Sequence, residues 1–464
     1  MTVKEMTNRH DLFEELKNET VAVYGYGRTG RSVVERLISL VNHLIVLEDG
    51  EPADFDEARA ATSSKTEWYF SPEELPADLD RLVLSPGVPV DNRLVSAARQ
   101  SNVLVQGEVE LAYSLCSGKI WAVTGTNGKS TCVEIIGSLL AARGKETVVC
   151  GNRGRPFLDA VFEQDSDQTN YVVEISSFQV ESMVDFSPDY ALLTNLGDDH
   201  QDRHDSLAEY HDLKWELLQR TNSSGRVCIP HELADLDGAV RTDVSDKVYF
   251  DRNHVGGAGY KVNWTDSGLS YGDLQVPAAE FPHLVNIFPQ NLLAALGIVQ
   301  PPPREQILRS ALTQLSVPPH RAELIEAGEK RVINDSKGTT PTSTRALVEA
   351  TPGKFSLILG GGDKGAEFGE LLQLLKDRGA DLQNLYLCAE KSLQERLKQG
   401  CSEKGLNAIE FTDWERAVKN LVEQAGDETT VLLSPGATSF DAFDNYRERG
   451  RCFRRWTREV TGSA

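Results

Sequence analysis

Hydrophobic residues in this chain form short unbroken runs that are separated by longer segments with helical periodicity. The runs cover residues 21–25, 44–49, 81–87, 102–108, 120–125, 147–151, 171–177, 190–195, 332–336, 355–362, 384–390 and 429–436. Apolar runs of this length are typical of strands that are buried on both faces. Their alternation with helices predicts parallel sheets, and therefore an α/β protein.

One segment breaks this alternation. Residues 254–277, HVGGAGYKVNWTDSGLSYGDLQVP, combine strand-like alternation with turn residues, which predicts a small antiparallel insert. Prolines interrupt the later chain in VQPPPREQ and in LSVPPHRAE, and the second is the better linker because a new series of strands and helices follows it. We therefore expect three domains, at residues 1–106, 107–318 and 319–464.

Composition narrows the class of protein. The chain has 464 residues, 40% of them hydrophobic and 25% charged, as in soluble globular proteins. Its net charge of -22 argues against nucleic-acid binding, because such proteins need a basic surface to neutralise phosphates. The seven cysteines show no metal-binding spacing, and no run is long enough to span a membrane. We expect a cytoplasmic protein that has no membrane span and does not bind nucleic acid.

The first glycine-rich loop, YGYGRTG, follows the strand at residues 21–23. Gly25, Gly27 and Gly30 fill the glycine positions of a dinucleotide-binding loop, and Glu48 lies about twenty residues further on, as that fold requires. Taken alone, the loop predicts a Rossmann-like domain that binds NAD. An NAD-dependent oxidoreductase is therefore one hypothesis for the function.

A second loop, GTNGKST, stands between a buried strand and an amphipathic helix. Such a loop binds phosphates through its backbone N–H groups, its lysine (Lys129) and a hydroxyl that holds Mg2+ (Ser130 or Thr131). Only two residues separate Gly125 from Gly128, where the usual phosphate loop has four. The middle domain is thus predicted to be a P-loop-type ATPase domain with a mostly parallel sheet, belonging to a subset of nucleotide enzymes.

Polar residues follow the next strands of the middle domain. Glu174 ends one strand, His200 comes just after another, and Lys214 lies on the helix that follows. Each of them alone would more often be structural or solvated. Ligands of open α/β sheets bind at the carboxyl ends of strands, so their placement together indicates a site for metal and phosphate.

At these residues the sequence resembles the ATP-dependent Mur ligases, which share the short GTNGKST loop with folylpolyglutamate synthetases. The resemblance also covers YGYGRTGRS, LSPGVP, GEVELA, GNRG, EISSFQ, DDHQDRH, PPHRAE, INDSKGT, GGGDKG and LLSPGATSFDAFDNYRERGRCF. The last segment is most similar to the members that add D-glutamate. The resemblance implies a Rossmann-like C-terminal domain and a bacterial enzyme of peptidoglycan precursor synthesis, which joins D-glutamate to UDP-N-acetylmuramoyl-L-alanine. In this reaction ATP converts a carboxylate into an acyl phosphate, which the amine then attacks.

The resemblance also implies roles for residues around ATP. Two Mg2+ ions are expected, one near Ser130 and Glu174, the other near His200 and Lys214, with Lys214 carrying a CO2-derived carbamate. The expected ATP contacts are Gly125, Thr126, Asn127, Gly128, Lys129, Ser130, Thr131, Asn291, Arg321, Asp335 and Lys337. The segment PQNLLAAL departs from the family where adenine binds, because it has Gln290 in place of a histidine and Ala294 in place of an asparagine.

Substrate contacts follow in the same way. The first glycine loop is reassigned to the UDP diphosphate, and Glu48 to the neighbourhood of the uridine. The expected substrate contacts are Gly27, Arg28, Thr29, Gly30, Glu48, Ser85, Gly87, Asn152, Ser176, Gln179, Thr339, Lys364, Ser439, Phe440 and Tyr446. The arginines of RERGRCFRRW are expected to form mostly a solvated helix face.

Three alternatives accompany this hypothesis. A Mur ligase that adds a different amino acid is the main one. The NAD-dependent oxidoreductase leaves the second loop and the C-terminal motifs without a role, and a noncatalytic nucleotide-binding protein would not need Lys129, Glu174, His200 and Lys214 together. We further expect a monomer.

Overall fold

The protein is represented by a computed structural model that describes residues 9–52, 54–62, 66–197, 203–204, 206–238, 244, 246–251, 253–257, 260–265, 268–271, 274–277, 289–300, 304–315, 319–328 and 330–462. The chain divides into two compact units. One comprises Met1–Leu196, Asp202–Asn263 and Leu293–Gln314, and the other Gly197–Gln201, Trp264–Leu292 and Leu315–Ala464. Among the described helices, none is both long and apolar enough to cross a membrane.

The N-terminal sheet has five parallel strands in the order β3-β2-β1-β4-β5. The strands are β1 (Thr20–Tyr24), β2 (His43–Glu48), β3 (Thr66–Phe70), β4 (Arg81–Leu84) and β5 (Leu104–Gly107). This is the order of a Rossmann fold, in which ligands bind where the strand order reverses, between β1 and β4. The Rossmann-like prediction is confirmed, and the first glycine loop follows β1 at this switch point.

Helices cover both faces of the N-terminal sheet. They are α2 (Arg9–Leu16), α3 (Arg28–Leu37), α4 (Phe55–Ala61) and α5 (Arg93–Gln100). Val33, Val34 and Leu37 of α3 pack with one set of strand residues, and Leu94 and Val95 of α5 pack with the other. Alternate residues of β1, β2 and β4 therefore enter different cores, which is why these strands read as continuous apolar runs.

The middle sheet has ten strands in the order β15-β14-β13-β12-β11-β10-β9-β6-β8-β7. Strands β6 to β11 are parallel to one another. The pairs β11–β12, β12–β13 and β14–β15 are antiparallel. The bounds are β6 (Lys119–Thr124), β7 (Thr147–Gly151), β8 (Asn170–Glu174), β9 (Tyr190–Leu193), β10 (Arg226–Pro230), β11 (Asp246–Phe250), β12 (His254–Gly257), β13 (Tyr260–Thr265), β14 (Gly268–Tyr271) and β15 (Leu274–Pro277). The predicted antiparallel insert, residues 254–277, is confirmed.

Helices of this part of the chain connect successive strands. They are α6 (Glu108–Leu115), α7 (Lys129–Ala142), α8 (Phe157–Glu163), α9 (Ser177–Val180), α10 (Leu207–Gln219), the 3-10 helix η1 (His231–Gly238), α11 (Pro289–Ile298) and α12 (Glu305–Gln314). The sheet order places β6 between β8 and β9. The segments after these three strands therefore meet at one edge of the sheet.

The C-terminal sheet has six strands in the order β16-β17-β21-β18-β19-β20. They are β16 (Glu323–Ala327), β17 (Lys330–Asn334), β18 (Phe355–Gly360), β19 (Leu382–Leu387), β20 (Ile409–Glu410) and β21 (Thr430–Gly436). Only the β16–β17 pair is antiparallel among these strands. The central strands β17, β21 and β18 are neighbours, so the segments after them lie side by side.

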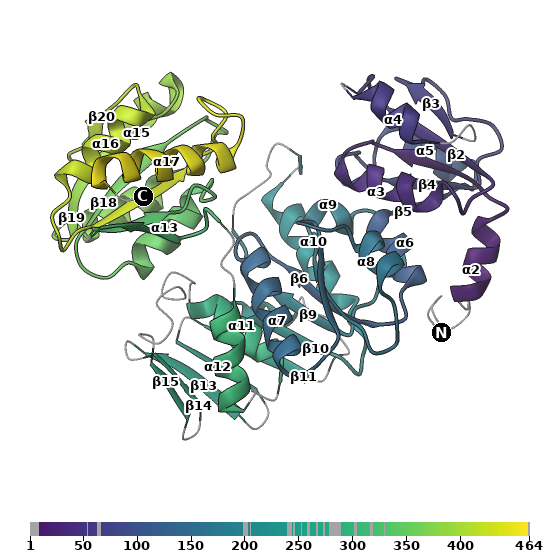
Figure 1. Ribbon diagram of the computed structural model, residues 1–464, viewed down its shortest axis with the longest axis horizontal. Helices are drawn as coiled ribbons and strands as arrows, with labels where there is room; N and C mark the ends of the chain where they lie inside the picture. Colours follow the sequence, from purple (N-terminus) through teal and green to yellow (C-terminus); the bar gives the residue numbers. More distant parts are fainter. Residues whose placement is uncertain are drawn as a thin grey trace. The chain divides into compact units, whose positions relative to one another are not determined.

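The C-terminal sheet is covered on both faces. Its helices are α13 (Pro341–Ala350), α14 (Gly369–Asp377), α15 (Lys391–Lys404), α16 (Trp414–Gln424) and α17 (Tyr446–Thr461). Leucines of α13, α14 and α15 pack on one face, and α16 and α17 pack on the other. The yellow part of Figure 1 shows α17 lying along the sheet. The mixed α/β fold with three sheets is as predicted.

The sequence analysis did not predict β3, β10, β11, β16 or β20. Strands β3, β16 and β20 lie at sheet edges, where apolar runs are weaker because burial is partial. Each of the three sheets falls largely within one of the predicted domains, while the exact boundaries remain a prediction. Six cysteines are buried and Cys452 is partly buried, and all seven are free thiols.

Candidate active site

The GTNGKST loop joins β6 to α7. Gly125 and Gly128 have φ values of 138° and 83°, a region that favours glycine. Helix α7 starts at Lys129, and Gly128 supplies no side-chain cap. The N–H groups in the first turn of α7 therefore point toward the place where a phosphate would bind. The helix dipole favours negative charge there.

The segment after β9 holds this loop in shape. Thr194 Oγ1 donates to the carbonyl of Asn127 at 2.5 Å, and the amide of Asn127 donates to Asn195 Oδ1 at 2.9 Å. A Cβ atom at Gly125 would lie 1.9 Å from Thr194 Oγ1. The sequence analysis missed Thr194 and Asn195. In the sequence they can be recognised as two hydrogen-bonding residues directly after β9, the strand that pairs with β6.

Lys129 folds back over the loop. Its Nζ donates to the carbonyls of Gly125 at 2.6 Å and Thr126 at 2.9 Å. The lysine thus lies over the loop whose backbone would surround the phosphates. A bound phosphate would offer its amine a charged acceptor in place of these neutral carbonyls.

Glu174 lies at the end of β8 and is only 2% exposed. Its Oε2 accepts a hydrogen bond from Ser130 Oγ, and its Oε1 accepts one from Asn152 Nδ2 at 3.0 Å. A buried carboxylate beside a hydroxyl and an amide is a set of hard oxygen donors of the kind Mg2+ prefers. No cage of three or more His, Cys, Asp or Glu side chains occurs in the part of the chain that the structure describes.

Lys214 is on α10 and is only 1% exposed. Its Nζ lies 3.7 Å from the centroid of the Tyr210 ring, one helical turn earlier. The hydroxyl of Tyr210 is 3.4 Å from Thr126 Oγ1 in the phosphate loop. Lys214 is thereby connected to the loop through Tyr210, a residue that the sequence analysis did not single out. The other predicted residue of this group, His200, lies outside the described residues.

The first glycine loop has the geometry of a diphosphate site. Ser85, after β4, donates through Oγ to the carbonyl of Gly25 at 2.6 Å, and Gly25 has a φ of 90°. A Cβ atom at Gly30 would lie 1.8 Å from the Gly25 carbonyl oxygen, so only glycine fits there. The space beside Gly27 and Gly87 is open, with no atom within 4 Å of a Cβ built there.

Helix α3 begins at Arg28, followed by Thr29, and it has no side-chain cap. Its first N–H groups are therefore available to an anion. Glu48 is turned toward the loop, because its Oε2 accepts from the amide of Tyr26. The guanidinium of Arg28 donates to the carbonyl of Asn152. Arg28, Asn152 and Glu174 thus form a continuous hydrogen-bonded chain from the first glycine loop to the β8 strand end.

Ser176 and Gln179 form a capping box at α9. The amide of Ser176 donates to Gln179 Oε1 at 2.9 Å, and the Ser176 hydroxyl donates to the same oxygen at 3.0 Å. The short helix therefore starts three residues after Glu174 in a defined conformation. Both residues belong to the predicted substrate contacts, and they lie next to Glu174 in the sequence.

Asp335 follows β17 and is buried. Its Oδ2 accepts from Ser434 Oγ at 2.7 Å, and its Oδ1 accepts from the amide of Ala322 at 3.1 Å. Burial raises the pKa of Asp335 to about 6, and the Ser434 hydrogen bond opposes this rise. The Ala322 contact places Arg321, the preceding residue, near the β17 strand end. Lys337 Nζ lies 4.7 Å from the centroid of the Tyr446 ring.

The predicted amino-acid contacts follow three neighbouring strands. Thr339 comes after β17, Lys364 after β18, and Ser439 with Phe440 after β21. The last two segments are joined by Thr438, whose carbonyl accepts from the Gly362 amide at 3.0 Å. Lys364 is exposed, and Phe440 is 71% exposed although it is a large apolar side chain.

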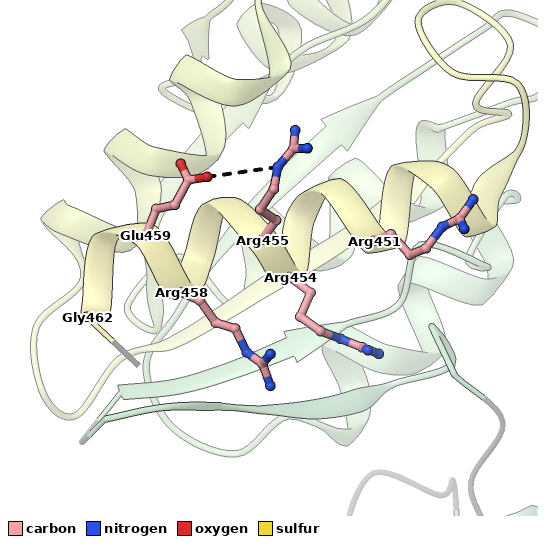
Figure 2. Close-up of a pocket in the computed structure, with 6 residues that line it drawn as sticks. All are labelled: Arg451, Arg454, Arg455, Arg458, Glu459 and Gly462. Carbon is pink, nitrogen blue, oxygen red and sulfur yellow. Dashed lines mark ion pairs between the residues drawn. The ribbon is translucent and has the colours of Figure 1, made fainter. Parts of the chain in front are cut away.

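The arginines of α17 differ in their exposure to solvent. Figure 2 shows Arg451, Arg454, Arg455 and Arg458 extending from the helix in different directions, with Arg455 turned toward Glu459. Nε of Arg455 lies 3.9 Å from Oε1 of Glu459. Arg449 differs, because it is only 1% exposed. The prediction of a solvated face is wrong for this residue. A sequence position alone cannot reveal an arginine that turns inward against loops from other strands.

The segment PQNLLAAL starts α11. Asn291 is buried at 4% exposure, Gln290 is partly buried, and Ala294 is buried at 1%. The carbonyl of Ala294 accepts a contact from Cys228 Sγ at 3.6 Å. At position 294 this chain therefore has a core residue in place of a polar group.

Comparisons with known proteins agree over most of the chain. Residues 123–299 match the Mur ligase middle domain, and residues 320–436 match the Mur ligase glutamate ligase domain. A protein of Alkaliphilus oremlandii, named UDP-N-acetylmuramoylalanine--D-glutamate ligase, is 30% identical over 95% of this chain and 98% of its own length. One of Lachnospira eligens with the same name is 32% identical over 95% of this chain and 98% of its own length.

The chain belongs to the Mur ligase family.

A solved structure shows the same fold. The crystal structure of a MurF ligase from Thermotoga maritima in complex with ADP has a TM-score of 0.55, with 15% identity over 97% of this chain and 96% of that chain. Mur ligases are ATP-dependent amide ligases, so family membership confirms the ligase prediction and sets aside the oxidoreductase suggested by the first glycine loop.

The Mur ligase fold brings part of the predicted site together. In one unit, the hydrogen bonds described above connect Ser130, Glu174, Asn152 and Arg28, and Lys129 precedes Ser130 in the sequence. In the other unit, Asp335 and Lys337 lie after β17, beside the segments that carry Lys364 and Ser439. The ligand roles of these residues remain predictions.

Proposed function

We propose that this chain is the Mur ligase that adds D-glutamate to UDP-N-acetylmuramoyl-L-alanine, with hydrolysis of ATP, in bacterial peptidoglycan precursor synthesis. The observation that carries the proposal is the match to D-glutamate ligases over 95% of the chain. The GTNGKST loop beside the buried Glu174 supports it independently, because it is suited to phosphoryl transfer.

The chemistry requires an activated carboxylate. The γ-phosphoryl group of ATP is transferred to the carboxylate of the L-alanyl substrate, which gives an acyl phosphate and ADP. The amine of D-glutamate then attacks the acyl carbon, and phosphate leaves as the amide forms. Catalysis of phosphoryl transfer is mainly positioning and charge stabilisation, so no nucleophilic side chain is needed.

Residues of the phosphate loop would do the positioning. Lys129 would leave the Gly125 and Thr126 carbonyls and bind the β and γ phosphates, with the loop N–H groups around them. Ser130 and Glu174 would hold one Mg2+, since they offer adjacent hard oxygens. A bound Mg2+ would neutralise charge that develops on the phosphates.

Lys214 would hold a second Mg2+ together with His200. An unmodified ammonium repels a cation, whereas a carbamate offers oxygen ligands, and Lys214 is buried where a persistent charge needs a partner. We expect protein equilibrated with 13C-bicarbonate to give a carbamate carbon NMR signal. Lys214→Arg should lack this signal, while Lys145→Arg, at an exposed position, should keep it. A wild-type spectrum without the signal would contradict the carbamate.

The first glycine loop would bind the UDP diphosphate. The uncapped start of α3 presents N–H groups, and the open space beside Gly27 and Gly87 lets a diphosphate approach the backbone. Arg28 and Thr29 lie in the first turn. Ser85 would shape the loop through its bond to Gly25, and Glu48 through its bond to Tyr26. Asn152, Ser176 and Gln179 would contact the muramoyl part.

The C-terminal segments would bind D-glutamate. Its two carboxylates need a cation and several donors, which Lys364, Thr339 and Ser439 can supply. The exposed Phe440 and the Tyr446 ring would cover the carbon chain, because such side chains lose water-exposed area when a ligand binds. Asn291, Arg321, Asp335 and Lys337 would contact ATP. We expect the enzyme to be a cytoplasmic monomer.

One assay tests the proposal. Purified protein is mixed with ATP, Mg2+ and UDP-N-acetylmuramoyl-L-alanine, and phosphate release is measured with each of several single amino acids. D-glutamate should give release, whereas L-lysine, diaminopimelate and L-alanine should not. Release only with another amino acid would overturn the specificity, and release with none would favour a noncatalytic protein.

A further inference from the structure

The buried Arg449 is in an unfavourable place for a cation. It lies one turn from the start of α17, whose N-cap is Asn445, so the helix dipole opposes its charge. It is the largest fully buried side chain among the described residues, with 1% exposure. Burial lowers the pKa of Arg449 to about 10, against the attraction of Asp441 and Asp335. Burying a charged side chain at this position destabilises the folded protein, so we expect Arg449 to have a compensating role.

The guanidinium binds two of the site segments at once. Nη2 donates to the Ser336 carbonyl at 2.9 Å and to the Ala437 carbonyl at 3.1 Å. Nη1 donates to the Thr438 carbonyl at 2.8 Å, and Nε donates to Ser336 Oγ at 3.1 Å. All these acceptors are neutral oxygens. The arginine therefore joins the segment after β17 to the segment after β21.

Two further contacts extend this connection. Ser336 Oγ donates to the Tyr446 carbonyl at 2.8 Å, which ties the start of α17 to the same point. Thr438 Oγ1 donates to the Gly362 carbonyl at 3.1 Å, two residues before Lys364. The predicted amino-acid contacts therefore all lie close in sequence to these hydrogen bonds. Tyr446 is three residues before Arg449, and Thr339 is three residues after Ser336. Ser439 and Phe440 follow Thr438, and Lys364 is two residues after Gly362.

We propose that Arg449 is a positioning residue for the acceptor amino acid, because its guanidinium fixes residues 335–339 and 437–440 relative to each other. The inference rests on the proposed function, since it takes these segments as the D-glutamate contacts. Arg449 itself does not touch the substrate. The planar guanidinium holds its N–H groups in fixed directions and so binds several carbonyls in one geometry. A lysine ammonium cannot reproduce this geometry.

The test is Arg449→Lys in the full chain, with KM measured separately for D-glutamate and for UDP-N-acetylmuramoyl-L-alanine. The KM for D-glutamate should rise about 10-fold or more, because the contact segments are no longer held in one geometry. The KM for the UDP substrate should change by less than about twofold, since its predicted contacts lie elsewhere in the chain. Arg455→Lys, on the exposed face of α17, is the matched control and should leave both values unchanged.

A second variant covers the case that Arg449→Lys does not fold. Ser336→Ala keeps the arginine but removes the hydroxyl between Nε and the Tyr446 carbonyl, and it should raise the KM for D-glutamate about threefold. Equal rises in both KM values, or an unchanged KM for D-glutamate in both folded variants, would overturn the proposal. If the wild type uses another amino acid, the proposed specificity fails, and the same comparison with that amino acid still tests Arg449.

Discussion

The side-chain amide of Asn152 donates a 3.0 Å hydrogen bond to Oε1 of Glu174, while Ser130 Oγ donates to the other carboxylate oxygen. The backbone carbonyl of Asn152 accepts from Arg28 at the start of α3. One asparagine therefore orients the predicted Mg2+ ligand and connects it to the first glycine loop. Partners that orient a metal ligand affect metal affinity even though they do not touch the metal.

Asn152→Ala should weaken the response to Mg2+. Without the amide donor, Glu174 is free to turn away from the ion, so the Mg2+ concentration for half-maximal activity should rise about 10-fold. Titration of activity with Mg2+ measures this. Asn18→Ala, at an exposed position just after α2, should show the wild-type response. An unchanged Mg2+ requirement in Asn152→Ala would mean that Glu174 does not depend on this amide.

Lys129→Ala should abolish turnover without unfolding the protein. The lysine donates to two loop carbonyls, and during the reaction it would stabilise phosphate charge. We expect kcat to fall by about 10^3-fold or more, with a melting temperature within about 2 °C of the wild type. Lys145→Ala, after the end of the same helix, should keep full activity. Near-normal turnover in Lys129→Ala would remove the loop from the mechanism.

Glu108 should make stability depend on pH. Its Oε1 accepts from the Leu158 amide at 2.6 Å, and burial raises the pKa of Glu108 from 4.5 to about 7. The folded state therefore binds more protons than the unfolded state between these pH values. The contribution of Glu108 to stability is fully present below pH 4.5 and is lost as the pH rises through about 7.

Glu108→Gln should remove this dependence. The free energy of unfolding of the wild type should decrease by up to roughly 3 kcal/mol from this residue alone between about pH 5 and about pH 8. Denaturant unfolding of both proteins at several pH values measures the difference. Glu73→Gln, at an exposed position, is the control and should follow the wild type. A variant with the same pH slope as the wild type would contradict the role of Glu108.

Ser434→Ala should move the acidic limb of the activity profile. The Ser434 hydroxyl lowers the pKa of Asp335, so its removal should raise that pKa further above about 6. If the ionised form of Asp335 contacts ATP, the pH at which kcat/KM is half-maximal should increase by about one unit. The pH profile of Ser402→Ala, at the exposed end of α15, should match the wild type. A profile that does not move would show that Asp335 does not control activity.

Several features of this protein follow from local sequence alone. The two glycine-rich loops are recognisable because a buried strand, tight glycine turns and a helix start are all short-range patterns. The same holds for Glu174, which ends its strand. The antiparallel insert at residues 254–277 was predicted from alternation and turn residues. Strands such as β3 and β20 were missed because an edge strand needs few buried residues.

The tertiary structure decided which residues meet. Arg449 lies ten residues after Ser439 and 113 residues after Ser336, and the helical arginine pattern gave no reason to separate it from its exposed neighbours. Thr194, Asn195 and Tyr210 became recognisable only when β9 and α10 were placed beside the phosphate loop. Sequence periodicity reports whether a side chain is buried on average, whereas the direction of a single guanidinium or hydroxyl depends on backbone oxygens contributed by other strands.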